Sequence, residues 1–327
     1  MHLKCVLCWP AFSPVIEVIV PSYTFVSTAL AFVRQGARIV FADSRMDNPC
    51  IDEQKLEALV TPRTRAIVPV HYAGIACDMD VILAVAERHN LLVIEDAAQA
   101  IDSFYKGRPL GSIGHLAAFS FHETKNIQCG EGGLLAINDP RFVKRSEILW
   151  EKGTNRAEFF RGEINKYGWV DTGSSFLPPE YVAAFLWAQL EALDSIQQKR
   201  KEIWNMYYQN LQGISSLSLP VLPDYATNNA HAFYAVCATS EERTALIRYL
   251  KSHGVYSVFH YLSLHKSDFV KNQKWEVEEL PQADKYTDCL VRFPLFYALE
   301  PDEVKYICEQ IKSFYTSERD EASFGER

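Results

Sequence analysis

The first candidates for chemistry are two neighbouring carboxylates at the end of an apolar segment. Residues 91–99 read LLVIEDAAQ, so a predicted buried strand ends at Glu95 and Asp96. Ligands of open α/β sheets bind beyond the carboxyl ends of the strands, which puts Asp96 at the edge where ligands bind. The same side chain could instead cap a helix that begins at Ala97. This segment alone does not separate the two interpretations.

A lysine follows the next predicted strand, twenty-nine positions after that aspartate. Residues 120–126 read SFHETKN, and Lys125 precedes the glycine-rich run GEGG at 130–133, where the backbone can turn sharply and approach a ligand. A lone lysine is usually a solvated surface group. A lysine paired with a strand-end aspartate is what pyridoxal phosphate chemistry requires, because the lysine forms a Schiff base and the carboxylate keeps the pyridine nitrogen protonated.

The composition argues against several other classes of partner. The 33 Lys+Arg against 41 Asp+Glu give a net charge of -8 and no electrostatic basis for binding nucleic acid. No apolar run reaches the roughly 18 residues that a membrane span needs. The CxxC at Cys5 and Cys8 has no second pair and no nearby histidine, so no metal site is predicted. The eight cysteines are scattered, which favours free thiols and a reducing, cytoplasmic compartment.

Short apolar strands alternate with helical segments through the first half of the chain. This order predicts an α/β fold with a mostly parallel sheet and helices on both faces. The predicted strands are residues 15–20, 38–41, 66–70, 91–94, 117–121 and 134–137, and the predicted helices are 28–35, 52–60 and 80–89.

The second half has a different pattern. Apolar residues recur at helical spacing from 180 to about 211, and the proline- and asparagine-containing stretch 219–229 is typical of a connector. A small α+β unit follows, with predicted strands at 233–237 and 256–259 and predicted helices at 241–253 and 301–315. We therefore expect an atypical N-terminal segment (1–17), a large domain (18–210), a small C-terminal domain (211–316) and a fraying polar tail (317–327).

Five motifs in order resemble the DegT-type nucleotide-sugar aminotransferases. They are PSYTF at 21–25, VPVH at 68–71, EDAAQ at 95–99, SFHETKN at 120–126 and GEGG at 130–133. The likeness runs from about residue 18 to about residue 315. It implies the aspartate-aminotransferase-like fold (fold type I) of pyridoxal-phosphate-dependent enzymes, with an N-terminally incomplete large domain and a small α+β domain.

Further segments are most similar to family members that make dTDP-4-amino-4,6-dideoxygalactose for enterobacterial common antigen. They are EKGTNRAEFFR at 151–161, GSS at 173–175, WAQLE at 187–191 and VFHYLSLH at 258–265. This resemblance implies that glutamate gives its amino group, through pyridoxal 5'-phosphate, to the 4-keto carbon of a dTDP-4-keto-6-deoxyhexose. It also implies a cytoplasmic homodimer that works in polysaccharide biosynthesis.

The resemblance implies a role for each matching position of the cofactor site. Lys125 corresponds to the Schiff-base lysine, Asp96 to the partner of the pyridinium nitrogen, and Gln99 to the residue near the ring hydroxyl. Ser120 corresponds to a phosphate-binding hydroxyl, and Phe25 to the aromatic side chain that packs on the ring face.

Three other positions are implied to lie near the substrate or the subunit boundary. The loop around Ser175 corresponds to one that reaches the phosphate of the neighbouring subunit, at a position where many relatives carry asparagine. His260 and His265 fall in a segment near the sugar-nucleotide site. Taken as bare residues, the two histidines could equally be buried structural groups.

The segment before the first motif differs from the family. Relatives have a further N-terminal portion in which a Ser/Thr–Ala turn at a helix N-terminus holds the cofactor phosphate through backbone N–H groups. Residues 1–15 do not resemble it, and no such helix start precedes Pro21. We therefore expect the chain to lack part of that region, to bind the cofactor weakly and to turn over slowly.

Two alternative functions follow from the same motifs. Sugar dehydratases of this fold carry histidine in place of the Schiff-base lysine, so Lys125 argues against that activity. A non-catalytic remnant, or a regulatory subunit that pairs with a full-length relative, would fit the unlike N-terminal segment.

Overall fold

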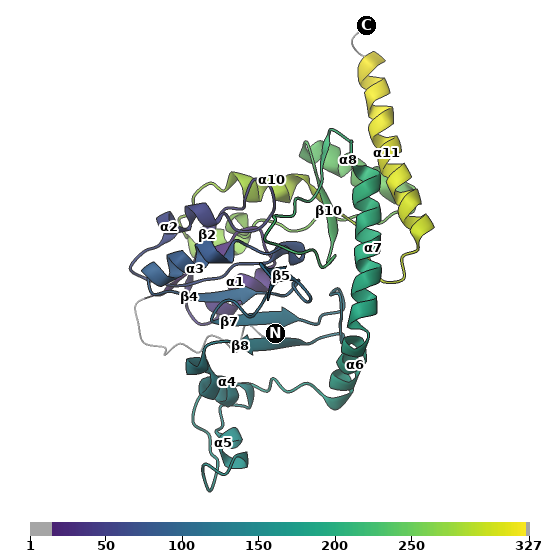
Figure 1. The fold of residues 1–327 in the computed structure, drawn as a ribbon. Helices are drawn as coiled ribbons and strands as arrows, with labels where there is room; N and C mark the ends of the chain where they lie inside the picture. Colours follow the sequence, from purple (N-terminus) through teal and green to yellow (C-terminus); the bar gives the residue numbers. More distant parts are fainter. Residues whose placement is uncertain (1–14, 325–327) are drawn as a thin grey trace.

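A six-stranded sheet lies at the centre of the computed structural model, which describes residues 15–324 (Figure 1). Its strand order is β2-β1-β3-β4-β7-β8, and every neighbouring pair is parallel except β7 and β8. The predicted mostly parallel α/β fold is therefore confirmed. The strands are β1 (Glu17–Pro21), β2 (Arg38–Ala42), β3 (Thr64–Ile67), β4 (Leu92–Asp96), β7 (Leu116–Ser120) and β8 (Gly133–Ile137).

The central strands are buried on both faces, as expected for a parallel sheet covered by helices. All five residues of β1 are buried, and β4 is buried at its last four positions. The helices of this part of the chain are α1 (Val26–Val33), α2 (Leu56–Leu59), α3 (Met79–Arg88), α4 (Val143–Trp150) and α5 (Arg156–Phe160). Short 3₁₀ helices lie at Glu53–Lys55, Tyr72–Gly74, Pro140–Phe142 and Leu264–Lys266.

A smaller antiparallel sheet forms the second unit, with the order β11-β10-β9. Figure 1 shows α7 running alongside both sheets and α11 extending beyond the rest of the molecule. The elements of this half are α6 (Glu180–Glu191), α7 (Leu193–Leu211), β9 (Leu217–Ser218), β10 (Phe233–Cys237), α8 (Ser240–Ser252), α9 (Asp268–Gln273), α10 (Pro281–Cys289), β11 (Leu290–Phe293) and α11 (Pro301–Phe324). A two-stranded ribbon, β5 (Phe104–Tyr105) with β6 (Arg108–Pro109), completes the sheets.

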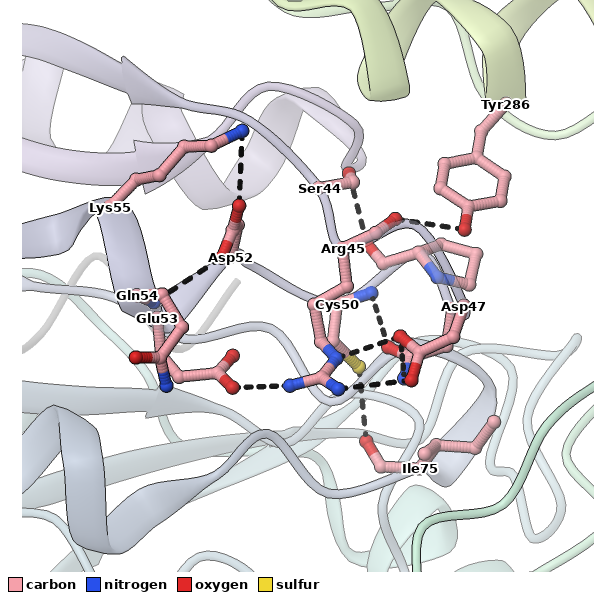
Figure 2. A network of polar contacts seen from close by, with 12 residues as sticks. Ser44, Arg45, Asp47, Cys50, Asp52, Glu53, Gln54, Lys55, Ile75 and Tyr286 are labelled. Atoms are coloured by element: carbon pink, nitrogen blue, oxygen red, sulfur yellow. Dashed lines mark hydrogen bonds and ion pairs between the residues drawn. The ribbon is translucent and has the colours of Figure 1, made fainter.

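The loop after β2 fastens the smaller unit to the large sheet (Figure 2). The Tyr286 hydroxyl of α10 donates to the backbone oxygen of Arg45 at 2.9 Å, and the Arg45 guanidinium donates to Asp47 at 2.8 Å and also to Glu53. The Asp43 carboxylate accepts the Ala283 N–H at 2.8 Å. These bonds fix α10 and the strand that follows it, β11, relative to the large sheet.

The hydrophobic core consists of clusters that each combine several elements. The largest buried cluster combines residues of the first four strands with Tyr234 of β10 and Tyr286 of α10. A second cluster joins α7 to β10 and α11, with Tyr207 and Phe233 stacked at its centre. The boundary near residue 210 therefore stays a prediction.

Three predicted elements differ from the observed ones. The helical region 180–211 is two helices, because the chain bends at Ala192, where the backbone leaves helical geometry without a glycine or proline to mark the break. The predicted strand 256–259 is reduced to one bridge between Val258 and Arg292. The predicted helix 52–60 is a 3₁₀ turn followed by one α-helical turn.

The two ends of the chain differ in what the structure describes. Helix α11 continues to Phe324, where a fraying tail was expected from Ser317 onward. The expectation about the unlike N-terminal segment falls on residues 1–14, outside the described residues, and on Val15, which is exposed. Across residues 15–324, no helix combines the length and apolar character that crossing a membrane requires.

Candidate active site

A cavity of about 490 Å³ opens where the large sheet meets the smaller unit. Its floor is formed by the carboxyl ends of β4 and β7, which contribute Asp96 and Ser120. The start of α1 contributes Phe25, and the smaller unit contributes His260 and Arg292. The edge of the sheet that the strand-end argument selected is therefore the edge that carries a cavity.

Asp96 is buried at the end of β4, and two donors hold its carboxylate. The Thr28 hydroxyl donates to Oδ2 at 2.6 Å, and the Ala98 N–H donates to Oδ1 at 3.1 Å. Thr24 bonds Thr28 in turn at 3.0 Å. The carboxylate lines the cavity, as the strand-end argument predicts. It also accepts a backbone N–H two residues on, but that N–H belongs to a turn, and no helix begins at Ala97.

Lys125 enters the cavity from the loop between β7 and β8. Burial lowers the pKa of its ammonium group from 10.5 to about 8, with the Asp96 charge opposing that change and the Arg292 charge adding to it. Lys125 and Asp96 share the cavity but form no direct ion pair with each other.

Gln99 and two residues of the smaller unit form one side of the cavity. The Gln99 amide oxygen accepts the Ala73 N–H at 2.6 Å, and its nitrogen donates to the Tyr261 hydroxyl at 2.9 Å. The adjacent His260 shares a hydrogen bond of 2.9 Å between its Nδ1 and the Tyr72 hydroxyl. Burial, with the charges of Arg292 and Lys125, lowers the pKa of His260 to about 2, so this imidazole stays neutral at working pH.

Two more predicted residues line the same cavity. The Ser120 hydroxyl accepts the His122 N–H at 3.3 Å at the end of β7. Phe25, with 54% of its surface exposed, lies at the start of α1 with its ring centroid 5.9 Å from that of Tyr261. Lys125, Asp96, Gln99, Ser120, Phe25 and His260 therefore come together around one cavity.

Ser175 and His265 lie elsewhere. Ser175 is exposed and bridges to Glu151 in the segment before α6. His265 is buried, with its Nδ1 2.7 Å from the Ser22 hydroxyl and its Nε2 3.6 Å from an Asp284 carboxylate oxygen. Neither lines the cavity of this chain.

Sequence reasoning missed several residues of the cavity, among them Thr28, Tyr261 and Arg292. Thr28 lies in the first turn of α1, a position that no motif marks as polar and functional. Tyr261 follows His260 directly and falls within the VFHYLSLH segment. Arg292 lies far from Lys125 along the sequence, with most of the smaller unit between them, so only the fold brings the two side chains to one cavity.

Beneath the cavity, Glu95 anchors the strand that carries Asp96. Its carboxylate accepts the N–H groups of Gly111 at 2.8 Å, Ile113 at 2.8 Å and Gly114 at 2.6 Å, and it lies 3.0 Å from Nε2 of His71. Burial acts to raise the pKa of Glu95, but His71 and the backbone donors outweigh it and lower that pKa. Glu95 faces away from the cavity and supports the site structurally.

The fold and this cavity define a fold type I enzyme of the pyridoxal phosphate class: a strand-end aspartate, a lysine of depressed pKa and a glutamine surround one pocket. Residues 3–312 match the family model of the DegT/DnrJ/EryC1/StrS aminotransferases. The chain belongs to this aminotransferase family.

Relatives and solved structures agree with that assignment. The spore coat polysaccharide biosynthesis protein SpsC of Bacillus subtilis (strain 168) is 35% identical over 307 residues, which span 90% of this chain and 78% of SpsC. A pleiotropic regulatory protein of Geobacillus stearothermophilus is 32% identical over 301 residues, 91% of this chain and 78% of that protein.

Among solved structures, Spr1654 of Streptococcus pneumoniae, described as a sugar aminotransferase and solved in its PLP form, superposes with a TM-score of 0.88. The two share 27% identity over 96% of this chain and 84% of that one. An aminotransferase from Psychrobacter cryohalolentis has the same TM-score of 0.88 at 28% identity, over 96% of this chain and 85% of its own.

Proposed function

We propose that this chain is a pyridoxal-phosphate-dependent aminotransferase that moves the amino group of glutamate to the 4-keto carbon of a dTDP-4-keto-6-deoxyhexose. The product would be dTDP-4-amino-4,6-dideoxygalactose. The observation that carries the reaction type is the shared cavity of Asp96 and Lys125. The choice of sugar rests on the similarity of the segments 151–161, 173–175, 187–191 and 258–265 to family members that make this product.

Each residue of the cavity has a task in this reaction. When bound, pyridoxal phosphate supplies an electron sink for the carbon that carries the amino group. Asp96 keeps the ring nitrogen protonated, and Thr28 and the Ala98 N–H hold Asp96 in place. Lys125, with a pKa of about 8, can take a proton from carbon and return it near neutral pH. Ser120 would bind the phosphate, and Phe25 would pack on the ring.

The cellular setting follows from the family. SpsC is named for polysaccharide biosynthesis, which supports a role in supplying an amino sugar for a polysaccharide. The six cysteines within the described residues are free and buried, which suits the reducing cytoplasm. A regulatory role is the second candidate, because one relative is named as a pleiotropic regulatory protein.

The test begins with the cofactor. Purified protein is titrated with pyridoxal phosphate, reduced with borohydride and digested, and the pyridoxyl label is expected on Lys125. Glutamate should then convert the bound cofactor to its amine form, and the keto sugar should convert it back. A label on another lysine, with Lys125 free, would falsify the assignment. Binding without amino transfer in either direction would favour the regulatory candidate.

A further inference from the structure

We propose that Arg292 binds the carboxylate of the amino-acid donor. This inference rests on the proposed aminotransferase function and assigns a residue to donor recognition. Arg292 lines the same cavity as Lys125, and its charge contributes to the lowered pKa values of both Lys125 and His260.

The backbone of Arg292 is held from both sides. It pairs with Tyr234 of β10 on one side. On the other side it exchanges two hydrogen bonds with Val258, the Arg292 N–H donating at 2.7 Å and the Val258 N–H donating at 3.1 Å. Because α10, just before β11, is tied to the large sheet through Tyr286, the guanidinium is carried on a fixed element at the cavity.

The guanidinium lacks an anionic partner within residues 15–316. No carboxylate there forms an ion pair with it, and its buried Nε has no hydrogen-bond acceptor. Another buried arginine, Arg200, shows the usual arrangement, donating to the backbone oxygens of Ala230 at 3.1 Å and His231 at 2.8 Å. A partly buried cation without a partner is costly, so a cavity that keeps one fits an anionic ligand.

The position of Arg292 selects between the two anions that the proposed reaction offers. In the amino donor, only the α-carbon separates the carboxylate from the nitrogen that reacts beside Lys125. In the nucleotide sugar, the diphosphate lies beyond the sugar ring from the keto carbon. An arginine in the same pocket as Lys125 therefore suits the carboxylate, and the planar guanidinium matches a carboxylate with two parallel hydrogen bonds.

The two half-reactions separate the two anions experimentally. Arg292→Met, Arg292→Lys and Arg243→Met are each loaded with the cofactor and followed by its absorbance. Arg243 is the matched control, because it is also half-buried in the smaller unit, also has a buried Nε without an acceptor, and lies outside the cavity. We expect Arg292→Met to weaken the glutamate half-reaction about 100-fold through KM. The keto-sugar half-reaction should change less than about 10-fold, because it loses only the effect of Arg292 on the pKa of Lys125, and Arg243→Met should leave both near wild type.

A binding measurement adds a readout that does not depend on turnover. Glutarate carries carboxylates but no amino group, and calorimetry should show it binding to wild type and Arg243→Met. Binding to Arg292→Met should be about 100-fold weaker, with partial recovery in Arg292→Lys, which keeps the charge but not the planar fork.

Other outcomes overturn the inference in distinct ways. Loss of the sugar half-reaction with normal glutamate transfer would assign Arg292 to the diphosphate. Equal loss of both half-reactions together with cofactor affinity would give it a structural role. If wild-type protein transfers no amino group but binds glutarate through Arg292, the proposed function fails while the carboxylate site stands.

Discussion

At the scale of single residues, the charge of Asp96 is supported on both carboxylate oxygens. The Thr28 hydroxyl and the Ala98 N–H both donate to it, and an ionised carboxylate is the form that accepts both. A neutral amide at this position keeps the shape but cannot hold a ring nitrogen protonated. The function of Asp96 therefore depends on its charge more than on its packing.

Asp96→Asn should leave the fold intact and slow amino transfer roughly 100-fold or more, in the range seen when one electrostatic group is removed from an active site. Single-turnover rates with glutamate measure the effect. Asp102→Asn is the control, since Asp102 bonds Gln197 and Lys201 outside the cavity. Near-normal turnover in Asp96→Asn would remove Asp96 from the mechanism.

The lowered pKa of Lys125 makes the free energy of unfolding of the cofactor-free protein depend on pH. Its pKa falls from 10.5 to about 8, mainly through burial, so the folded state holds its proton less tightly than the unfolded state. Below pH 8 both states are charged, and the burial penalty is fully present at roughly 3 kcal/mol. Between pH 8 and 10.5 the folded state releases its proton first, and the penalty disappears.

Lys125→Met should therefore stabilise the cofactor-free protein at pH 7, and the gain from removing the buried charge should fade as the pH approaches 10.5. Urea denaturation at both pH values measures this difference. Lys251→Met, at an exposed position of α8, serves as the control and should show little change at either pH. A gain that is the same at both pH values would show that Lys125 is not charged and buried at pH 7.

At the scale of elements, the strand ends could be predicted because an apolar run marks the strand and polar residues follow directly at its carboxyl end. The run LVI before Glu95 and Asp96 indicates a buried parallel strand, and the carboxyl end of such a strand is where a ligand site forms. The break at Ala192 could not be predicted, because the apolar spacing continues across it and alanine is a good helix former. The extended segment at 256–259 is held by one bridge to Arg292, a contact that local sequence does not encode.

Glu95 is expected to stabilise β4, the strand that carries Asp96. Replacing it with glutamine puts an NH2 group among the N–H groups of Gly111, Ile113 and Gly114, so donors face donors in a buried site. Glu95→Gln should lower the free energy of unfolding by about 3 kcal/mol. Glu131→Gln, which is exposed, should change it by less than about 0.5 kcal/mol. Equal stabilities in urea denaturation would mean that Glu95 is not an anchor.

At the scale of the whole molecule, the site combines parts that sequence distance keeps apart. Asp96 and Lys125 were predicted because each follows its own strand. Tyr261 and Arg292 were not, because the packing of α10 against the loop after β2 brings them to the cavity. The positions of Ser175 and His265 away from the cavity leave their implied roles as predictions, and for Ser175 that role requires a second subunit.

One surface of the chain is unusually apolar. No residue of α6 is buried, although much of the helix is apolar. Its large side chains are exposed: Tyr181 by 76%, Phe185 by 51% and Trp187 by 64% of their surface. Figure 1 shows α4 and α6 at opposite sides below the edge strand β8, joined by the segment that runs between them. An apolar hollow of about 450 Å³ lies between them, lined by Leu134, Val143, Trp150, Phe176 and Leu186. Exposed apolar side chains and an apolar hollow are both typical of a protein interface.

We expect this surface to pair two copies of the chain, as the family resemblance implies, which would bring the Ser175 loop toward the partner's cavity. Sedimentation at micromolar concentration should show a dimer. Trp187→Glu puts a charge where an apolar surface must lose its water, and it should shift the equilibrium toward monomer by several kcal/mol. Tyr306→Glu is the control, because Tyr306 is also exposed, at 43%, but lies on α11.

Dimer formation should also affect the affinity for the cofactor. If the Ser175 loop of one copy completes the phosphate contacts of the other, Trp187→Glu should weaken pyridoxal phosphate binding although residue 187 lies outside the cavity. The affinity should then rise with protein concentration as dimers re-form. Tyr306→Glu should bind the cofactor as wild type does. A wild-type monomer that binds the cofactor tightly would show instead that each chain holds a complete site.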